Sequence, residues 1–224
     1  MLARKLMRTN FVRNMYIQVQ ETPNPLSLKF LPGQQILPDT SKTYDFASAS
    51  TAVKQSPLAV KLLRVEGVKR VFFGENFVTI TKSDENVDWA LLRPEIFSTI
   101  ADHLQTGKPI INEENAGNGE EVEDTEVVLM IKEILESRIR PMVQEDGGDI
   151  VYVGFEEDTG TVKLKMQGSC TGCPSSGVTL KNGIENMLTF YVPEVKNVIE
   201  VKDESDDLVE RELAKFEQSR GIKD

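Results

Sequence analysis

Residues 161–180, which read TVKLKMQGSCTGCPSSGVTL, decide the fold of the second half of the chain. Polar and apolar residues alternate over 161–166, which is the pattern of a half-buried strand. Beyond the two cysteines, apolar residues recur at helical spacing at Val178, Leu180 and Ile184. The sequence therefore predicts a strand and a helix that are joined by a loop containing glycines and cysteines.

The segments on either side of this stretch complete a domain that we place at 126–203. Apolar stripes and alternating runs predict, in order, a helix, a hairpin of two strands, a helix and a last strand. These elements are expected at 126–139, at 150–155 with 161–166, after the cysteines, and at 195–201. The predicted order is αββαβ.

The first half of the chain predicts a separate domain at 16–111. Runs of β-branched and aromatic residues, turn residues and apolar periodicity predict short strands, a hairpin and two helices. They are expected at 16–20 and 26–30 around a rigid turn at 22–25, at 57–63, at 68–81 and at 89–104. The predicted fold class is α+β, with two small domains of the α/β type.

Three further segments lie outside these domains. Residues 112–125, NEENAGNGEEVEDT, hold six acids and no base, so we expect an acidic flexible linker that lets the domains reorient independently. Residues 1–15 carry four bases and no acid, the pattern of a mitochondrial presequence. An acidic C-terminal helix or tail is expected at 204–224, packed on the second domain.

Composition excludes several classes of function. Lys and Arg number 26 against 36 Asp and Glu, and the resulting net charge of −10 disfavours nucleic acid as a partner. No run approaches the roughly 20 apolar residues that span a bilayer, so no membrane partner is expected. Two cysteines and one histidine exclude a disulfide scaffold and any site that takes several imidazoles from one chain. Metal chemistry must then use thiolates or be shared between chains.

The chemistry is predicted at Cys170 and Cys173, which are the only thiols. Pro174 fits the first turn of the following helix, whose positive end would favour the thiolate of Cys173. Gly168 and Gly172 would let the backbone approach the sulfurs. Because thiolates are the metal-binding form, we expect two anionic sulfurs that are presented outward.

Two thiolates are half of the four protein ligands of a tetrahedral zinc site or a 4Fe-4S cluster. The single His103 lies in the other domain and is interpreted as a surface or core residue. A two-fold dimer would bring two such loops together and supply four sulfurs. The preferred interpretation is an exposed iron–sulfur cluster that bridges two subunits.

Other interpretations of the cysteine pair stay open. A dithiol–disulfide oxidoreductase would need one chain only, although the αββαβ order and a proline after the pair are not typical of it. A structural zinc clip normally has two such pairs in one chain, and an incidental buried pair would not need the surrounding glycines.

The turn at 146–149, DGGD, has too few carboxylates for a calcium site and is interpreted as structural. No catalytic residue is predicted.

Taken together, these motifs resemble a known family, the NifU-like (Nfu-type) iron–sulfur cluster scaffold proteins. The resemblance covers nearly all of the chain and rests on four stretches: 22–30 (TPNPLSLKF), 140–141 (RP), 146–149 (DGGD) and 168–176 (GSCTGCPSS). It implies that Cys170 and Cys173 of two subunits are the cofactor-binding and metal-binding residues for a labile 4Fe-4S cluster.

The resemblance also implies a carrier that is not an enzyme and is a homodimer when loaded. It implies delivery to apo-proteins of the mitochondrial matrix, such as lipoyl synthase and respiratory-complex subunits. Co-chaperones and glutaredoxin-type carriers are the implied upstream partners. Some relatives also occur outside mitochondria, so a cytosolic form is compatible with the sequence. The N-terminal domain has no ligand set, and we assign it to partner recognition or to the control of dimerisation.

Overall fold

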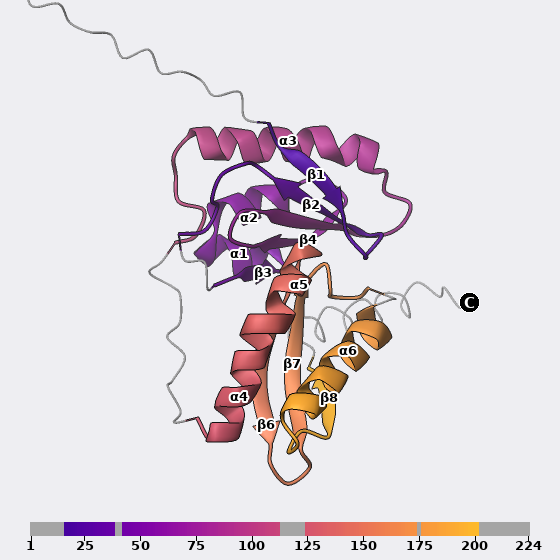
Figure 1. The fold of residues 1–224 in the computed structure, drawn as a ribbon. Helices are drawn as coiled ribbons and strands as arrows, with labels where there is room; N and C mark the ends of the chain where they lie inside the picture. The colour runs from indigo at the N-terminus through magenta and orange to yellow at the C-terminus, as the bar shows by residue number, and fades with distance from the viewer. Residues whose placement is uncertain (1–15, 39–41, 113–123, 174–175, 202–224) are drawn as a thin grey trace, which may run out of the picture.

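The computed structural model describes residues 16–38, 42–112, 124–173 and 176–201, and side chains in all of these except 176–178. The expected presequence, most of the expected linker and the expected C-terminal tail lie outside the described residues. Figure 1 shows two domains, with the ends of α5 and of the C-terminal sheet against the N-terminal domain. The two-domain α+β fold predicted from the sequence is confirmed.

The N-terminal domain is built on a five-stranded sheet in which every neighbouring pair is antiparallel, in the order β1-β2-β5-β4-β3. Its elements are β1 (Gln18–Glu21), β2 (Ser27–Leu31), β3 (Tyr44–Phe46), α1 (Ala49–Gln55), α2 (Pro57–Leu62), β4 (Val68–Phe73), β5 (Val78–Lys82) and α3 (Trp89–Gln105). Buried aromatic and aliphatic residues of the sheet and the helices form one core, which includes Phe30, Leu62 and Ile100. Strand β3 and helix α1 were not predicted.

Short capping interactions set the beginnings of the helices. Ser56 accepts a hydrogen bond from the Ala59 amide at the start of α2, and Pro57 occupies its first turn. Asp88 caps α3 by accepting from the Ala90 amide at 2.8 Å. These caps hold α2 and α3 where their apolar residues cover the sheet.

The C-terminal domain has a three-stranded sheet in the order β6-β7-β8. Strands β6 (Gly148–Glu156) and β7 (Thr161–Gly168) form the predicted antiparallel hairpin, and β8 (Asn197–Glu200) pairs parallel to β7. The helices are α4 (Glu126–Ile134), which continues through a π-helical turn η2 (Leu135–Ile139) into α5 (Arg140–Glu145), and α6 (Ser176–Tyr191). This order confirms the predicted αββαβ pattern. No helix in the described ranges is long and apolar enough to cross a membrane.

The sequence predicted that the first helix of this domain ends at residue 139. In the structure the helix continues past Pro141 to Glu145. A proline inside a helix lacks one donor and clashes with a carbonyl one turn earlier. The π-helical turn immediately before α5 changes the hydrogen-bonding register, so that Pro141 falls in the first turn of a new α-helical segment. The added turns carry the helix to the N-terminal domain.

Candidate functional site

The two cysteines lie in the loop between the end of β7 and α6. Successive turns fold this loop: the amide of Cys170 donates to the Gln167 carbonyl at 3.3 Å, and the amide of Cys173 donates to the Cys170 carbonyl at 3.5 Å. Gly168 and Gly172 both have positive φ, +64° and +68°, which a residue with a side chain adopts at a cost. The folded loop therefore places the two cysteines close together, and both are reduced thiols.

Two glycines near the cysteines have roles that the sequence did not predict. A Cβ atom on Gly168 would lie 2.9 Å from the Phe72 ring of the N-terminal domain, so the lack of a side chain here allows the two domains to pack closely. Gly148 makes room for a sulfur, because a Cβ atom there would collide with Cys170 Sγ. Sequence reasoning missed this role of Gly148, although two adjacent glycines before a strand were a visible signal.

Both cysteine residues are buried, with only 8% of Cys170 and 5% of Cys173 exposed, so the predicted outward presentation is wrong for this conformation. Cys170 packs with the apolar core of the C-terminal domain. This burial raises the pKa of the Cys170 thiol to about 12, which the hydrogen bond with Ser169 only partly offsets. At neutral pH Cys170 is a protonated thiol here, not the expected thiolate.

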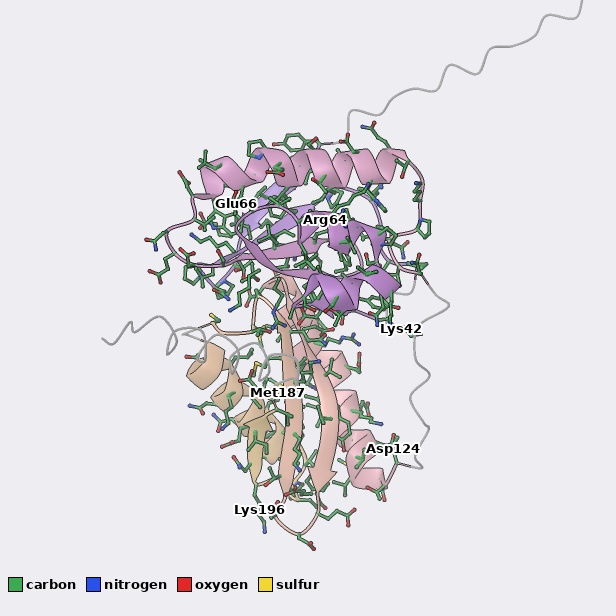
Figure 2. The ribbon with its side chains drawn as sticks, turned by 180° about the vertical axis from the view of Figure 1, so that it is seen from behind. Lys42, Arg64, Glu66, Asp124, Met187 and Lys196 are labelled. Atoms are coloured by element: carbon green, nitrogen blue, oxygen red, sulfur yellow. The ribbon has the colours of Figure 1, made fainter. Side chains whose placement is uncertain are left out.

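A cavity of about 360 Å³ opens beside the two cysteines. Its walls are mostly apolar side chains of the helices, including Met142 of α5 and Ile184 and Met187 of α6, the last of which Figure 2 labels. Pro23 of the N-terminal domain lines the same cavity. Thiol ligands inside an apolar shell favour a soft metal centre and limit the access of water to it.

The described residues contain no group of three or more His, Cys, Asp or Glu side chains that could hold a metal ion. His103 is fully buried in the N-terminal domain, where its Nε2 lies 3.3 Å from the Pro109 carbonyl oxygen, in agreement with a core role. Two thiols therefore supply half of a four-ligand site within this part of the chain.

The DGGD turn is structural, as interpreted from the sequence. Asp149 is fully buried and accepts from Arg140 Nε and Nη2, each at 3.0 Å, as well as from the Ile150 amide. Thr43 of the N-terminal domain also donates to Asp149, at 2.6 Å. A carboxylate with these partners is satisfied without a cation.

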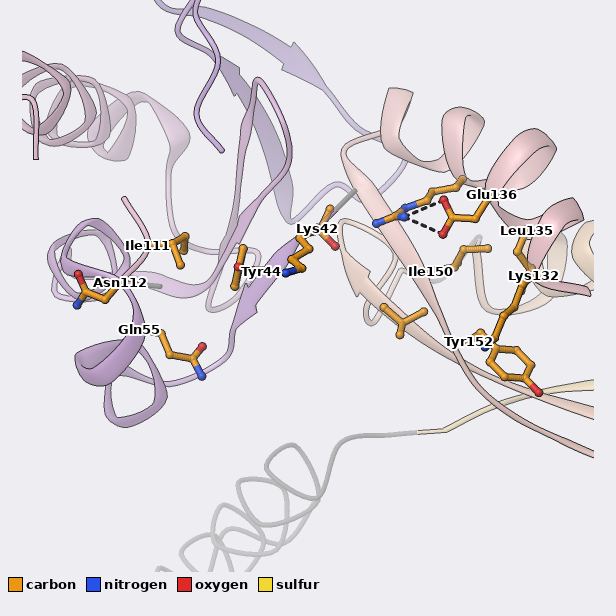
Figure 3. Close-up of a pocket in the computed structure, with 13 residues that line it drawn as sticks. Lys42, Tyr44, Gln55, Ile111, Asn112, Lys132, Leu135, Glu136, Ile150 and Tyr152 are labelled. Carbon is orange, nitrogen blue, oxygen red and sulfur yellow. Dashed lines mark hydrogen bonds and ion pairs between the residues drawn. The ribbon is translucent and has the colours of Figure 1, made fainter. Parts of the chain in front are cut away.

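A larger cavity, about 570 Å³, lies between the domains and contains neither cysteine. Figure 3 shows Lys42, Tyr44 and Gln55 on the N-terminal side and Lys132, Glu136 and Tyr152 on the C-terminal side. Its charged groups already have partners, since Arg140 pairs with Glu136 at 2.8 Å and Lys132 with Asp124 at 2.6 Å. This cavity therefore does not offer the unpaired charge that would attract an ionic ligand.

Comparison with known families places these motifs in context. Residues 17–107 match a family model described as the N-terminal part of the scaffold protein Nfu/NifU, and residues 131–199 match the NifU-like domain. The chain belongs to the Nfu family of iron–sulfur cluster scaffold proteins. The Nfu family consists of scaffolds and carriers, not enzymes.

Two Nfu relatives show how far the similarity extends. A human protein named NFU1 iron-sulfur cluster scaffold homolog, mitochondrial, is 56% identical over 197 residues, covering 88% of this chain and 76% of the relative. The Drosophila persimilis protein of the same name is 52% identical over 221 residues, covering 98% of this chain and 77% of the relative.

Solved structures of two other proteins are similar to parts of this Nfu chain. The solution structure of a NifU-like protein from Saccharomyces cerevisiae is 29% identical, covers 50% of this chain and 96% of that chain, and has a TM-score of 0.42. The crystal structure of SAV1430 from Staphylococcus aureus is 22% identical, covers 38% of this chain and 99% of that chain, and has a TM-score of 0.32. The family assignment rests on the sequence matches and not on these two structures.

Proposed function

We propose that this Nfu-family chain binds a labile 4Fe-4S cluster between two copies of itself, with Cys170 and Cys173 of each copy as ligands. The observation that carries the proposal is the position of the two thiols, which share one folded loop beside an apolar cavity. Thiolates are the usual protein ligands of iron–sulfur clusters, and a 4Fe-4S cluster takes four of them. A second copy related by two-fold symmetry completes this set.

Loading and transfer follow from thiol chemistry. Burial raises the pKa of Cys170 to about 12, so cluster binding must displace its proton, which passes to the solvent as the iron–sulfur bond forms. During transfer, each bond from iron to a cysteine of this chain breaks as a bond from iron to an acceptor thiolate forms. The oxidation state of the cluster does not change in this exchange, and the carrier completes no chemical turnover.

The cellular setting is proposed from the relatives, which are named as mitochondrial. We place the chain in the mitochondrial matrix, with residues 1–15 as presequence and residues 112–125 as linker between functional units at 16–111 and 126–203. The acceptors are apo-proteins such as lipoyl synthase and respiratory-complex subunits. Co-chaperones and glutaredoxin-type carriers act upstream.

The testing experiment is anaerobic reconstitution with ferrous iron and sulfide, followed by iron and sulfide assays and native mass spectrometry. We expect about two irons and two sulfides per chain on a dimer. Cys170→Ala and Cys173→Ala should each abolish cluster binding and dimerisation while circular dichroism shows an unchanged fold, because no disulfide is removed. A variant that still holds stoichiometric iron would overturn the proposal.

The oxidoreductase alternative gives a different result in the same experiment. It predicts a metal-free monomer that reduces a model disulfide through a bond between Cys170 and Cys173. The pKa of the Cys170 thiol does not separate the two schemes, because cluster binding and disulfide exchange both need the thiolate.

A further inference from the structure

We infer that Asn24, in the N-terminal domain, is a positioning residue for the cysteine loop of the C-terminal domain and holds that loop in its buried conformation. The Asn24 side-chain amide donates to the Ser169 carbonyl at 3.0 Å and to the Thr171 carbonyl at 3.3 Å. These two carbonyls flank Cys170 in the chain. Both donor hydrogens of one amide are therefore used on the backbone around a proposed cluster ligand.

The turn that carries Asn24 fixes its side chain in this orientation. Asn24 Oδ1 accepts from the Leu26 amide at 3.0 Å, and the Asn24 carbonyl accepts from the Ser27 amide at 2.9 Å. Thr22 Oγ1 donates to the same carbonyl at 2.9 Å. The acceptor end of the amide thus serves its own turn, while the donor end, in a residue that is only 1% exposed, faces the other domain.

Two further contacts dock the N-terminal sheet beside Asn24. Thr79 Oγ1 donates to the Gly147 carbonyl at 2.7 Å in a buried position. Lys29 Nζ donates to the carbonyls of Gln144 and Glu145, at the end of α5, at 3.0 Å each. Buried polar groups with satisfied partners are costly to separate, so this contact between the domains is a specific one.

The backbone of the C-terminal domain is shaped to receive this contact. Gly147 and Gly168 both have positive φ, +83° and +64°. A Cβ atom would lie 2.9 Å from Thr79 Oγ1 at Gly147, and 2.9 Å from the Phe72 ring at Gly168. The absence of side chains at these two turns lets the N-terminal sheet approach the cysteine loop closely.

The position of Asn24 gives the contact a consequence for cluster loading, which rests on the proposed function. A cluster that is shared by two copies must contact the cysteine sulfurs of both copies. Both cysteines are buried in this conformation. Pro23, the neighbour of Asn24, lines the cavity at these cysteines. Loading therefore requires the loop to leave its buried conformation, and the hydrogen bonds from Asn24 oppose that movement.

The test is the rate at which N-ethylmaleimide modifies Cys170 and Cys173 in the full-length, metal-free protein. Asn24→Asp keeps an oxygen to accept from the Leu26 amide but replaces the donor with an oxygen that faces two carbonyls. We expect the modification rate to rise about tenfold, as for the loss of a buried hydrogen bond that controls local opening. The added negative charge by itself would slow modification, because it disfavours the thiolate.

Two control variants separate this role from other effects. Asn86→Asp makes the same chemical change at an exposed site of the same domain and should leave the rate unchanged. Thr79→Val weakens the domain contact without removing a bond to the cysteine loop, and should raise the rate less than Asn24→Asp does. An unchanged rate for Asn24→Asp, or equal increases for Asn24→Asp and Thr79→Val, would overturn the role assigned to Asn24.

The melting temperature is measured alongside the modification rate, and both measurements are made on the iron-free protein. A rise in rate that is matched by a proportional loss of thermal stability would indicate general unfolding and would also overturn the inference. Because the modification is measured without iron or sulfide, a failure of the proposed cluster binding would not affect this result.

Discussion

The two domains contribute opposite partners to the hydrogen bonds that join them at the cysteine site. The N-terminal domain supplies side-chain donors, which are the amide of Asn24, the hydroxyl of Thr79 and the ammonium group of Lys29. The C-terminal domain supplies backbone carbonyls of the cysteine loop, of the DGGD turn and of the end of α5. The N-terminal domain thus contributes side-chain donors, and the C-terminal domain contributes carbonyl acceptors whose directions depend on the conformation of its backbone.

This difference shows what the contact can recognise. Carbonyl groups point in the required directions only when the turns that carry them have a particular conformation. The N-terminal domain therefore distinguishes the buried conformation of the cysteine loop from other conformations of the same loop. The sequence had suggested partner recognition or control of dimerisation for this domain, and contact with the cysteine loop offers a physical route to the second role.

The largest expected effect comes from adding a side chain at Gly168, where the backbone of the C-terminal domain meets the N-terminal domain. Gly168→Ala adds a Cβ atom at positive φ, 2.9 Å from the Phe72 ring and 2.8 Å from the Gly147 carbonyl oxygen. We expect the free energy of unfolding, measured by urea denaturation, to fall by about 3 kcal/mol. Gly172→Ala is the matched control, since it also has positive φ but nothing within 4 Å, and should lose only about 1 kcal/mol. Equal losses would show that the close contacts with Phe72 and the Gly147 carbonyl add nothing to the cost of a side chain at positive φ.

An intermediate effect comes from the burial of Cys170. Its thiol keeps its proton up to a pKa of about 12, whereas the unfolded chain loses this proton near pH 9. Between these values the unfolded state binds fewer protons, so rising pH favours unfolding. We expect the free energy of unfolding to fall by about 1 kcal/mol for each unit from pH 9 to pH 11.

The control for this pH effect is Cys170→Ala, in which the other titrating groups remain. Urea denaturation at several pH values should give a shallower fall for the variant than for the parent protein. Parallel pH profiles for the two proteins would contradict the burial of this thiol in solution.

The smallest expected effect concerns a contact made to a side chain instead of the backbone. Thr43→Val removes a donor at 2.6 Å from Asp149, which keeps its bonds to Arg140 and to the Ile150 amide. We expect a loss of about 1 kcal/mol in urea denaturation. Thr189→Val, at an exposed helical site, should change stability by less than about 0.5 kcal/mol. A larger loss for Thr43→Val than for Gly168→Ala would reverse the comparison between side-chain and backbone recognition.

Local patterns predicted most of the fold. Alternation over 161–166 identified β7, and apolar periodicity over 89–104 identified α3, because these signals lie within one element. The three residues of β3 and the Ser-rich start of α1 gave too short a pattern to detect. The continuation of the first C-terminal helix past Pro141 depends on a π-helical turn, which the periodicity of apolar residues does not predict.

The site was predictable only in part for a related reason. The positions of Cys170 and Cys173 between a strand and a helix followed from sequence, but their burial did not, because it depends on distant contacts. Asn24 and Ser169 are 145 residues apart in the chain. The sequence marked the turn at 22–25 and the turn at 146–149 as separate features, and nothing in either stretch showed that both meet the cysteine loop.

Recognition through carbonyl groups also limits how the interface can evolve. Every amino acid supplies the same carbonyl, so a substitution at Ser169 or Thr171 cannot compensate for the loss of the Asn24 amide. Correlated substitutions between the two domains should accordingly be scarce at this contact. A saturation mutagenesis screen would instead find one narrowly restricted position at Asn24, opposite loop positions that tolerate exchange as long as the backbone keeps its path.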